Sequence, residues 1–168
     1  NVGSAAYATN NTASTVKSRG IELTSNWKAN DILSFALNLT YTHTYDGAEA
    51  DDPNTSASYY GADTRLVRIP IHAMNLATKI NIPEYENLDL TIRTKYSDRV
   101  RDYGNTHSGW ADVELDDWIT HDLSVKYKLY DTYNVFFDFN NFLDEKYETS
   151  LNYSQAGRNF NFGLKRAF

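Results

Sequence analysis

The stretch LSFALNLTYTHTY, residues 33–45, alternates large side chains with small or polar ones along its whole length. Leucine, phenylalanine, tyrosine and histidine take the odd positions, and serine, alanine, asparagine and threonine take the even positions. Because successive side chains of a strand point to opposite faces, this period of two predicts a β-strand with one continuous apolar face. The stretch exceeds the usual strand length of about 5–6 residues. It is long enough for a tilted strand that crosses a bilayer, which needs about 9–11 residues.

Six further segments show the same alternation, and each predicts a strand. They are residues 19–29, 65–81, 88–97, 119–129, 133–140 and 157–168. Within residues 65–81 the apolar positions change parity near Pro70. Because proline cannot donate to a strand ladder, we expect either a sheet edge or a β-bulge at this proline, and a bulge would shift parity by one residue. The sequence therefore predicts seven strands.

The connections between these strands alternate strictly between short and long. Short turns are expected at residues 30–31, 83–87 and 130–132, and long polar connections at residues 46–63, 98–117 and 142–156. An antiparallel meander with this alternation has short turns at one end of the sheet and long connections at the other. Transmembrane β-barrels have this asymmetry, with short periplasmic turns and long extracellular loops.

Aromatic and charged residues also follow a membrane pattern. Aromatic residues make up 14% of the chain, and many gather near the predicted strand ends, as in the interfacial belts of membrane proteins. Those beside short turns are Trp27, Tyr127, Tyr130 and Tyr133, and those beside long connections are Tyr41, Tyr45, Tyr96 and Trp118. Charged residues lie on the opposite parity, where a barrel has its lumen: Glu22, Lys28, Arg93, Lys95, Asp122, Lys126, Asp138 and Lys165.

The pattern favours an all-β fold that is the C-terminal portion, about seven antiparallel strands, of a large transmembrane β-barrel. Bacterial single-chain barrels have an even number of strands, and an open sheet edge in lipid is prohibitively costly. We therefore expect residues 1–168 to be one segment of a barrel whose earlier strands lie elsewhere. A soluble β-sandwich, with the apolar face as its core, is the alternative that period two alone leaves open.

Composition narrows the function classes. The chain has no cysteine, which excludes disulfides and cysteine-based metal sites. The net charge of −6 argues against binding of nucleic acid, which requires a concentration of lysine and arginine. No Ser-His-Asp or Cys-His spacing is visible, so we expect no catalytic residues, no enzyme activity, no metal site and no cofactor.

Four segments together resemble the TonB-dependent outer-membrane receptors. They are GIELTSNWKANDILSFALNLTYTHT, a Gly-hydrophobic-Glu strand with its turn and rising strand; RIPIHAMNLATKI, an Arg-x-Pro-x-His strand; NVFFDFNNFLDEKYETS; and GRNFNFGLKRAF, a Gly-Arg-aromatic strand that ends in phenylalanine. The third segment resembles the family through Asn141, Phe142, Leu143, Asp144 and Tyr147. Phe136 departs from the pattern, because it is bulky and has the parity of the lumen.

The resemblance implies a barrel of roughly 22 strands in the bacterial outer membrane, with a lumen filled by a plug domain. It implies a receptor and transporter for a scarce large nutrient, such as a ferric siderophore, haem or cobalamin. The implied partners are TonB, reached through the plug, outer-membrane lipid and lipopolysaccharide, and the barrel-assembly machinery, which would recognise Phe168. A passive porin or another barrel protein, including a barrel enzyme, is the alternative function.

The candidate ligand-binding residues mix aromatic rings with guanidinium groups in or beside the long connections. Such a mixture suits an anionic or aromatic chelate through charge-assisted hydrogen bonds and stacking, and it equally suits ordinary loop packing. The candidates are Tyr59, Tyr60, Arg65, Arg68, Arg99, Arg101, Tyr103 and Trp110.

Histidines and acidic residues are weaker candidates. His43 and His121 have the apolar parity near the long connections, which favours an interfacial role, and His107 lies in a long connection, where we expect solvation rather than ligation. Clustered carboxylates suit Ca²⁺, but we expect solvated loop charge, bridged by divalent ions to lipopolysaccharide. The clusters are Asp46, Glu49, Asp51 and Asp52, and Asp112, Glu114, Asp116 and Asp117.

Overall fold

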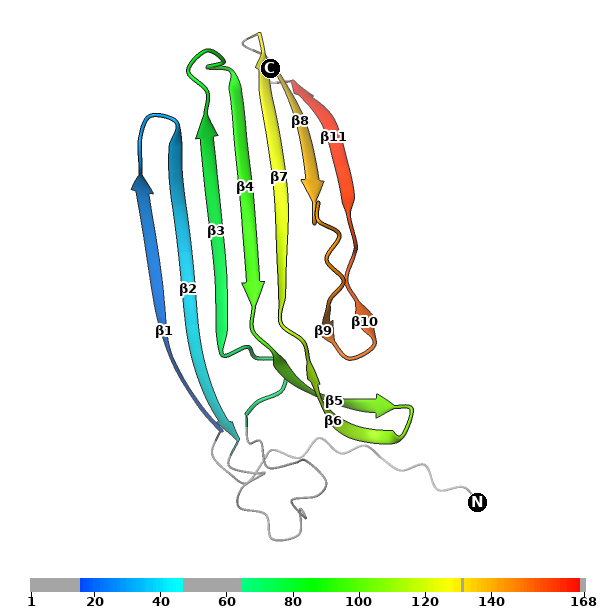
Figure 1. Cartoon of the computed structure of the whole chain (residues 1–168). Coiled ribbons are helices and arrows are strands. Elements are labelled where there is room, and N and C mark those ends of the chain that lie inside the picture. The colour runs from blue at the N-terminus through cyan, green and yellow to red at the C-terminus, as the bar shows by residue number, and fades with distance from the viewer. Residues whose placement is uncertain (1–15, 47–64, 131, 167–168) are drawn as a thin grey trace.

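The computed structural model describes residues 16–46, 65–130 and 132–166. Seven long strands of the described chain form one antiparallel sheet in which sequential strands are neighbours (Figure 1). In order across the sheet they are β1 (Val16–Lys28), β2 (Leu33–Asp46), β3 (His72–Asn81), β4 (Leu88–Ser97), β7 (Trp118–Leu129), β8 (Tyr133–Asn140) and β11 (Asn159–Arg166).

This arrangement confirms the predicted seven-stranded meander. The tight turns after β1, β3 and β7 lie together at one end of the sheet, and the long connections lie at the other (Figure 1). The described residues add only two short hairpins to the sheet, so no second large sheet faces it, as a sandwich would require. They also contain no helix that is long and apolar enough to cross a membrane.

The strand register confirms the two-faced pattern. One row across four strands is apolar and consists of Leu23, Leu39, Met74 and Tyr96. The row next to it, on the opposite face, is polar and consists of Thr24, Asn38, Asn75 and Lys95. Many side chains of the apolar face are open to the surroundings, with Phe162 78% exposed and Ile21 71% exposed. A water-soluble sheet would cover such a face, whereas in a membrane barrel lipid covers it.

The first tight turn shows how local chemistry ends β1. The side-chain Oδ1 of Asn30 accepts hydrogen bonds from the backbone N–H groups of Ile32 and Leu33, at 2.9 and 2.8 Å. Asparagine caps a turn in this way because its side chain replaces a backbone acceptor. Lys28 and Asp31 form an ion pair of 2.6 Å at the same turn. Trp27 and Phe35 stack just beyond it on the apolar face, with ring centroids 4.9 Å apart, as an aromatic belt requires.

Phe136 lies on the polar face, as its parity predicts, and covers a glycine. It is paired with Gly163 across β8 and β11. A Cβ atom at Gly163 would lie 2.5 Å from Cζ of the Phe136 ring. The absence of a side chain at Gly163 therefore gives the bulky ring its space.

The strand predicted over residues 65–81 is wrong in its first half. β3 begins only at His72, and no bulge occurs at Pro70. Residues 65–71 instead form a turn in which Arg68 has a positive φ of 63°, a conformation outside the strand region. The backbone N–H of Arg68 donates to the carbonyl of Arg101 at 2.7 Å, so its hydrogen bond goes to the 98–117 connection.

Two of the long connections contain hairpins of their own. The connection 98–117 contains the hairpin of β5 (Val100–Thr106) and β6 (Gly109–Leu115). The connection 142–156 contains a small hairpin of β9 (Glu148–Ser150) and β10 (Tyr153–Ser154). The expectation that Trp118 belongs to an aromatic belt is wrong, because the register opposes it to Ser97 on the polar face. There its ring packs at a tilt against Tyr147, with ring centroids 4.4 Å apart.

Candidate functional site

The candidate site is the group of segments at the long-connection end of the sheet, here called the loop cluster: residues 65–71, 98–117 and 141–158. The β5–β6 hairpin projects beyond the sheet, with the β9–β10 hairpin close to its base (Figure 1). Contacts both within and between these segments fix their positions.

Asp102 of β5 joins the three segments. Its side chain is 0% exposed, and its carboxylate accepts four hydrogen bonds. Oδ1 accepts from Nε of Arg68 and from the backbone N–H of Tyr103, both at 2.8 Å. Oδ2 accepts from the backbone N–H of Leu151 at 2.6 Å and from the hydroxyl of Ser150 at 3.2 Å. One buried carboxylate therefore satisfies donors from residues 65–71, from β5 and from the β9–β10 hairpin.

These donors decide the ionisation of Asp102. Burial by itself raises the pKa of the carboxyl group, because it disfavours the charged form. The backbone N–H groups of Leu151 and Tyr103, followed by the Arg68 guanidinium, outweigh burial, and the pKa lies below its ordinary value of 3.8. Asp102 is therefore ionised at neutral pH, and these donors form hydrogen bonds with its charged carboxylate.

Gly104 brings the β9–β10 hairpin close to β5. A Cβ atom at Gly104 would lie 2.9 Å from Cδ2 of Leu151, so the leucine side chain occupies the space over the glycine. Val100 and Leu115 at the base of the β5–β6 hairpin are the buried apolar residues of the described chain, at 7% and 8% exposure. The loop cluster thus has a small packed interior of its own.

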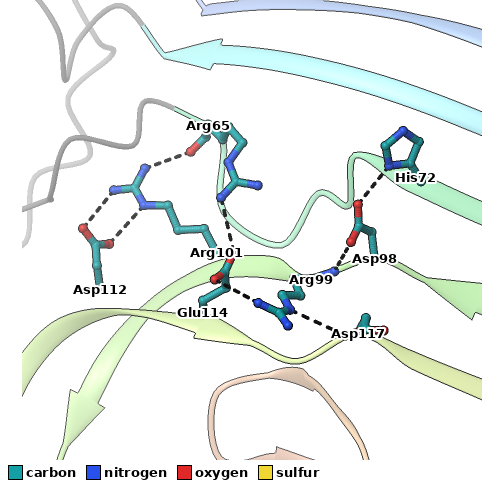
Figure 2. Close-up of polar contacts among 8 residues, drawn as sticks. All are labelled: Arg65, His72, Asp98, Arg99, Arg101, Asp112, Glu114 and Asp117. Carbon is teal, nitrogen blue, oxygen red and sulfur yellow. Dashed lines mark hydrogen bonds and ion pairs between the residues drawn. The ribbon is translucent and has the colours of Figure 1, made fainter.

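Arg101, the neighbour of Asp102, holds the other side of the hairpin. Its side chain is 5% exposed. It forms a two-pronged contact with Asp112 of β6, from Nε at 3.1 Å and from the second terminal nitrogen at 3.3 Å. It also donates to the carbonyl of Arg65 at 2.8 Å (Figure 2). Bidentate geometry and burial make this pair a fixed structural contact.

Arg99 and Arg65 pair with acidic residues of the 98–117 connection. Arg99, whose side chain is 56% exposed, lies 3.5 Å from Asp117 and 4.0 Å from Glu114. Arg65 reaches the other oxygen of Glu114 at 3.6 Å (Figure 2). These distances are long for ion pairs, and exposed pairs of this kind contribute little to stability. They leave Arg99 able to exchange partners at low cost.

His72 and Asp98 form a separate pair where β3 begins and β4 ends. Nδ1 of His72 lies 2.9 Å from Oδ2 of Asp98 (Figure 2). The hydrogen bond to His72 is the main reason that the pKa of Asp98 is lowered, because it outweighs burial. The backbone N–H of Arg99 donates to the other oxygen at 2.9 Å and contributes to the same shift.

Six of the eight predicted ligand-binding residues lie in the loop cluster: Arg65, Arg68, Arg99, Arg101, Tyr103 and Trp110. The backbone of Trp110 lies in β6 opposite Asn105. Tyr59 and Tyr60 lie outside the described residues, as does Phe168.

The acidic residues are partners of these arginines. Asp112, Glu114 and Asp117, which the sequence presented as solvated charge or as Ca²⁺ ligands, each lie within ion-pair distance of arginine. In the described part of the chain, no three histidine, aspartate or glutamate side chains converge as a metal site requires. Glu49, Asp51 and Asp52 lie outside the described residues, and the side chain of Asp46 is not described.

A second polar network explains the Asn141–Tyr147 segment. Asn141 is 5% exposed and has a positive φ of 47°, which asparagine tolerates. Its Nδ2 donates to the carbonyls of Glu145 and Ala156, at 2.9 and 3.3 Å, and its Oδ1 accepts from the backbone N–H of Glu145 at 2.9 Å. Its own backbone N–H donates to Asp122 of β7 at 2.9 Å. Asn141 therefore ties the end of β8 to the segment that leads into β11.

Asp144 completes this turn. It has a positive φ of 63°, and its Oδ1 accepts from the backbone N–H of Arg158 at 2.8 Å and from Nζ of Lys146 at 3.0 Å. These two contacts, with that from Arg158 the larger, lower the pKa of Asp144. A Cβ atom at Gly157 would lie 2.7 Å from the same oxygen. The motif residues Asn141, Asp144 and Gly157 thus fix the path of the chain between β8 and β11.

Sequence reasoning missed Asp102 and the structural role of Arg101. The available signal was the alternation of residues 109–115, with Ala111, Val113 and Leu115 on one parity and Asp112 and Glu114 on the other, next to a turn that contains Gly109, whose φ is 107°. This pattern predicts a hairpin, and a hairpin would have placed Arg101 near the carboxylates of β6.

Comparison with protein families supports a membrane barrel. The family model described as TonB dependent receptor-like, beta-barrel, matches residues 1–142. A search of curated proteins found no match.

Solved structures of similar fold are iron and siderophore receptors. The ferric-catecholate import receptor Fiu from K12 E. coli aligns with a TM-score of 0.72 at 13% identity, over 91% of this chain and 21% of that chain. The ferripyoverdine receptor of the outer membrane of Pseudomonas aeruginosa aligns with a TM-score of 0.67 at 16% identity, over 90% and 19%. The FrpB iron transporter from Neisseria meningitidis aligns with a TM-score of 0.62 at 15% identity, over 89% and 23%.

At these identities the likeness shows the fold alone. The chain spans about a fifth of the length of each of these structures.

Proposed function

The chain belongs to the TonB-dependent receptor β-barrel family, and from this premise we propose that it is the C-terminal part of a receptor that imports a scarce large nutrient. Proteins of this family are β-barrels of the Gram-negative outer membrane, which is therefore the location of this chain. The family consists of receptors and transporters rather than enzymes. The observation that carries the proposal is the family match over residues 1–142, together with the seven-stranded sheet whose apolar face is uncovered.

The nutrient that we propose is a ferric siderophore. The similar structures include a receptor bound to ferripyoverdine, a ferric-catecholate import receptor and an iron transporter. Haem and cobalamin are the other large nutrients that this function includes, and the same assay separates all three.

We propose that the loop cluster contacts the ligand through its exposed guanidinium groups. Arg68 and Arg99 have side chains that are 53% and 56% exposed, so a ligand reaches them without unfolding the hairpin. Arg65, at 25%, lies beside them, whereas Arg101 supports the hairpin from within. An anionic chelate would replace the weak carboxylate partners of Arg99 with charge-assisted hydrogen bonds. The other proposed contacts are Tyr59, Tyr60, Tyr103 and Trp110.

The proposed partners follow from the family and lie outside this chain. They are TonB, reached through a plug domain, and the remaining strands of the barrel, which pair with the open edges of β1 and β11. Phe168 is proposed as the signal for the barrel-assembly machinery. Outer-membrane lipid and lipopolysaccharide surround the barrel.

A binding panel tests the proposal with the full-length receptor in cells. Iron-loaded catecholate, hydroxamate and pyoverdine-type siderophores, haem and cobalamin are titrated separately, and we expect saturable binding of one siderophore class. Arg99→Gln removes a charged hydrogen-bond donor, for which about 1.5–3 kcal/mol predicts at least roughly tenfold weaker binding. The matched control is Lys28→Gln, at the opposite end of the sheet, which should leave affinity unchanged. Absence of saturable binding by every compound, with the barrel folded, would contradict the proposal.

A further inference from the structure

The polar face of the sheet, which lines the lumen of a barrel, has a hollow near its tight-turn end, here called the luminal basin. It is a cavity of about 210 Å³ that crosses β3, β4 and β7. The register places Thr91 and Ser124 side by side at its centre, with Lys79 in the same row on β3. Arg93 lies one row closer to the loop cluster, and Lys126 one row closer to the tight turns. Two short hydroxyl side chains therefore form the floor of the basin, and longer charged side chains form its rim.

The luminal basin is positively charged. Lys79, Arg93 and Lys126 share its rim with one carboxylate, that of Asp89, which leaves a net charge of +2. Oδ1 of Asp89 lies 3.1 Å from Nζ of Lys79, so the charges of these two residues offset each other. Among the residues that the structure describes, the side chains of Arg93 and Lys126 have no ion-pair partner. Two such cations in one hollow concentrate anions from the surrounding solution.

The nearest carboxylates outside the basin already accept hydrogen bonds from other groups. Asp122 is opposite Arg93 in the register. Its Oδ2 accepts from Nζ of Lys95 and its Oδ1 from the backbone N–H of Asn141, both at 2.9 Å. In the next row, Asp138 accepts from the hydroxyl of Ser124 at 2.6 Å. The guanidinium of Arg93 is therefore available to a further anion.

The luminal basin continues a series of cations along β4. Arg93 and Lys95 are successive residues of its polar face, about 7 Å apart at roughly 3.3 Å per residue. Arg99, an exposed arginine of the loop cluster, follows four residues after Lys95. An anion that leaves Arg99 and moves toward the tight-turn end of the sheet therefore meets another cation at each step until it reaches the basin.

We propose that the luminal basin is a transit site for an anionic metal chelate with at least two negative charges, an inference that rests on the import function proposed above. Carboxylate or catecholate oxygens of the chelate contact Arg93 and Lys126 through charge-assisted hydrogen bonds, and the hydroxyl of Thr91 donates to them from the floor. A carboxylate held permanently in the lumen is the other possible occupant. The series of cations that leads from the loop cluster to the basin favours a mobile anion over a fixed one.

A thiol placed on the floor of the basin tests its charge preference without knowledge of the nutrient. The full-length receptor with Thr91→Cys is treated with a methanethiosulfonate reagent that bears either a sulfonate or a trimethylammonium group, and mass spectrometry follows the peptide that contains residue 91. We expect the anionic reagent to react roughly tenfold faster than the cationic one. Adding Arg93→Gln and Lys126→Gln should remove this preference, whereas Arg93→Lys with Lys126→Arg should keep it. The matched control is Lys165→Gln, which removes a cation from the polar face of β11 at the same end of the sheet and should also keep it.

Two results of the labelling would overturn the proposal, provided that heat-modifiable migration in a gel shows the receptor to be folded. Equal rates for the two reagents would mean that the basin does not attract anions. Lack of reaction with both reagents would mean that a fixed part of the receptor fills the basin.

Uptake by cells connects the luminal basin to transport. The probes are ⁵⁵Fe-loaded tris-catecholate and citrate-type chelates, both of which are anionic. Arg93→Gln with Lys126→Gln should lower the initial rate of import roughly tenfold, while affinity at the cell surface, measured with the energy supply blocked, should stay within about twofold of wild type. Import at the wild-type rate by the folded double variant would overturn the proposal. Failure of the wild-type receptor to bind either chelate would instead contradict the anionic nutrient proposed for the loop cluster, and the labelling result would still decide whether the basin attracts anions.

Discussion

Replacement of Asp102 by asparagine should weaken the contacts between the three segments of the loop cluster while leaving the sheet intact. Asparagine has nearly the same shape, but it presents one acceptor oxygen where aspartate presents two. Because each oxygen of Asp102 accepts two hydrogen bonds, the variant loses two of the four. If the new amide group faces Leu151, two N–H donors oppose each other in a site that is 0% exposed. If it faces Arg68, the guanidinium loses its charged partner.

The size of the effect follows from these contacts. Hydrogen bonds to a charged group contribute about 1.5–3 kcal/mol each, so the loss of two costs at least about 3 kcal/mol. This corresponds to a roughly 100-fold increase in the population that opens locally. Deuterium uptake by a peptide that covers residues 148–156 of the full-length receptor measures this opening, and we expect exchange to accelerate by about that factor. Asp116→Asn, on the same connection, is the control and should leave the uptake unchanged.

An Asp102→Asn receptor whose uptake at residues 148–156 stays within about threefold of wild type would contradict this prediction. Such a result would mean that the Leu151–Gly104 packing holds the hairpins together without the carboxylate.

Three other predictions concern pH, the returning turn and the glycine under Phe136. The pKa of Asp102 is lowered in the folded state, so its contribution to stability is fully present above the ordinary carboxyl pKa of 3.8 and is lost as the pH falls through the lower folded value. The protection of the Leu151 amide against hydrogen exchange should therefore be equal at about pH 7 and pH 5 and should disappear only below pH 3.8. Asn141→Ala removes three side-chain hydrogen bonds from a buried site and should cost about 2–4 kcal/mol, measured as a lower urea midpoint for the refolded barrel. Gly163→Ala places a methyl group 2.5 Å from the Phe136 ring and should cost about 1–3 kcal/mol in the same assay, and Phe136→Leu in the Gly163→Ala background should recover most of it.

The sheet was predictable from the sequence because its determinants are local. Alternation along residues 33–45 reports directly which side chains share a face, and the lengths of the connections report which ends of the strands are joined. The structure places both features as the sequence indicates. The parity of Phe136 was also correct, although its glycine partner lies 27 residues away on another strand.

The loop cluster was not predictable, because contacts between distant segments determine it. Residues 65–71 alternate like a strand, yet Arg68 turns with a positive φ and pairs with Asp102, 34 residues away. Trp118 has an aromatic side chain at a strand end, but the partner that decides its face is Tyr147. The period of a sequence shows which side chains of one strand share a face, but it does not show which distant residue each side chain contacts.

We propose that this chain is part of a receptor that imports an iron chelate with energy supplied through TonB. The most direct test is uptake of a ⁵⁵Fe-loaded siderophore by cells that express the full-length protein, compared with cells that lack either the protein or TonB. We expect saturable uptake that requires both the protein and TonB. Uptake that is linear in concentration and independent of TonB would contradict it and would indicate a passive pore.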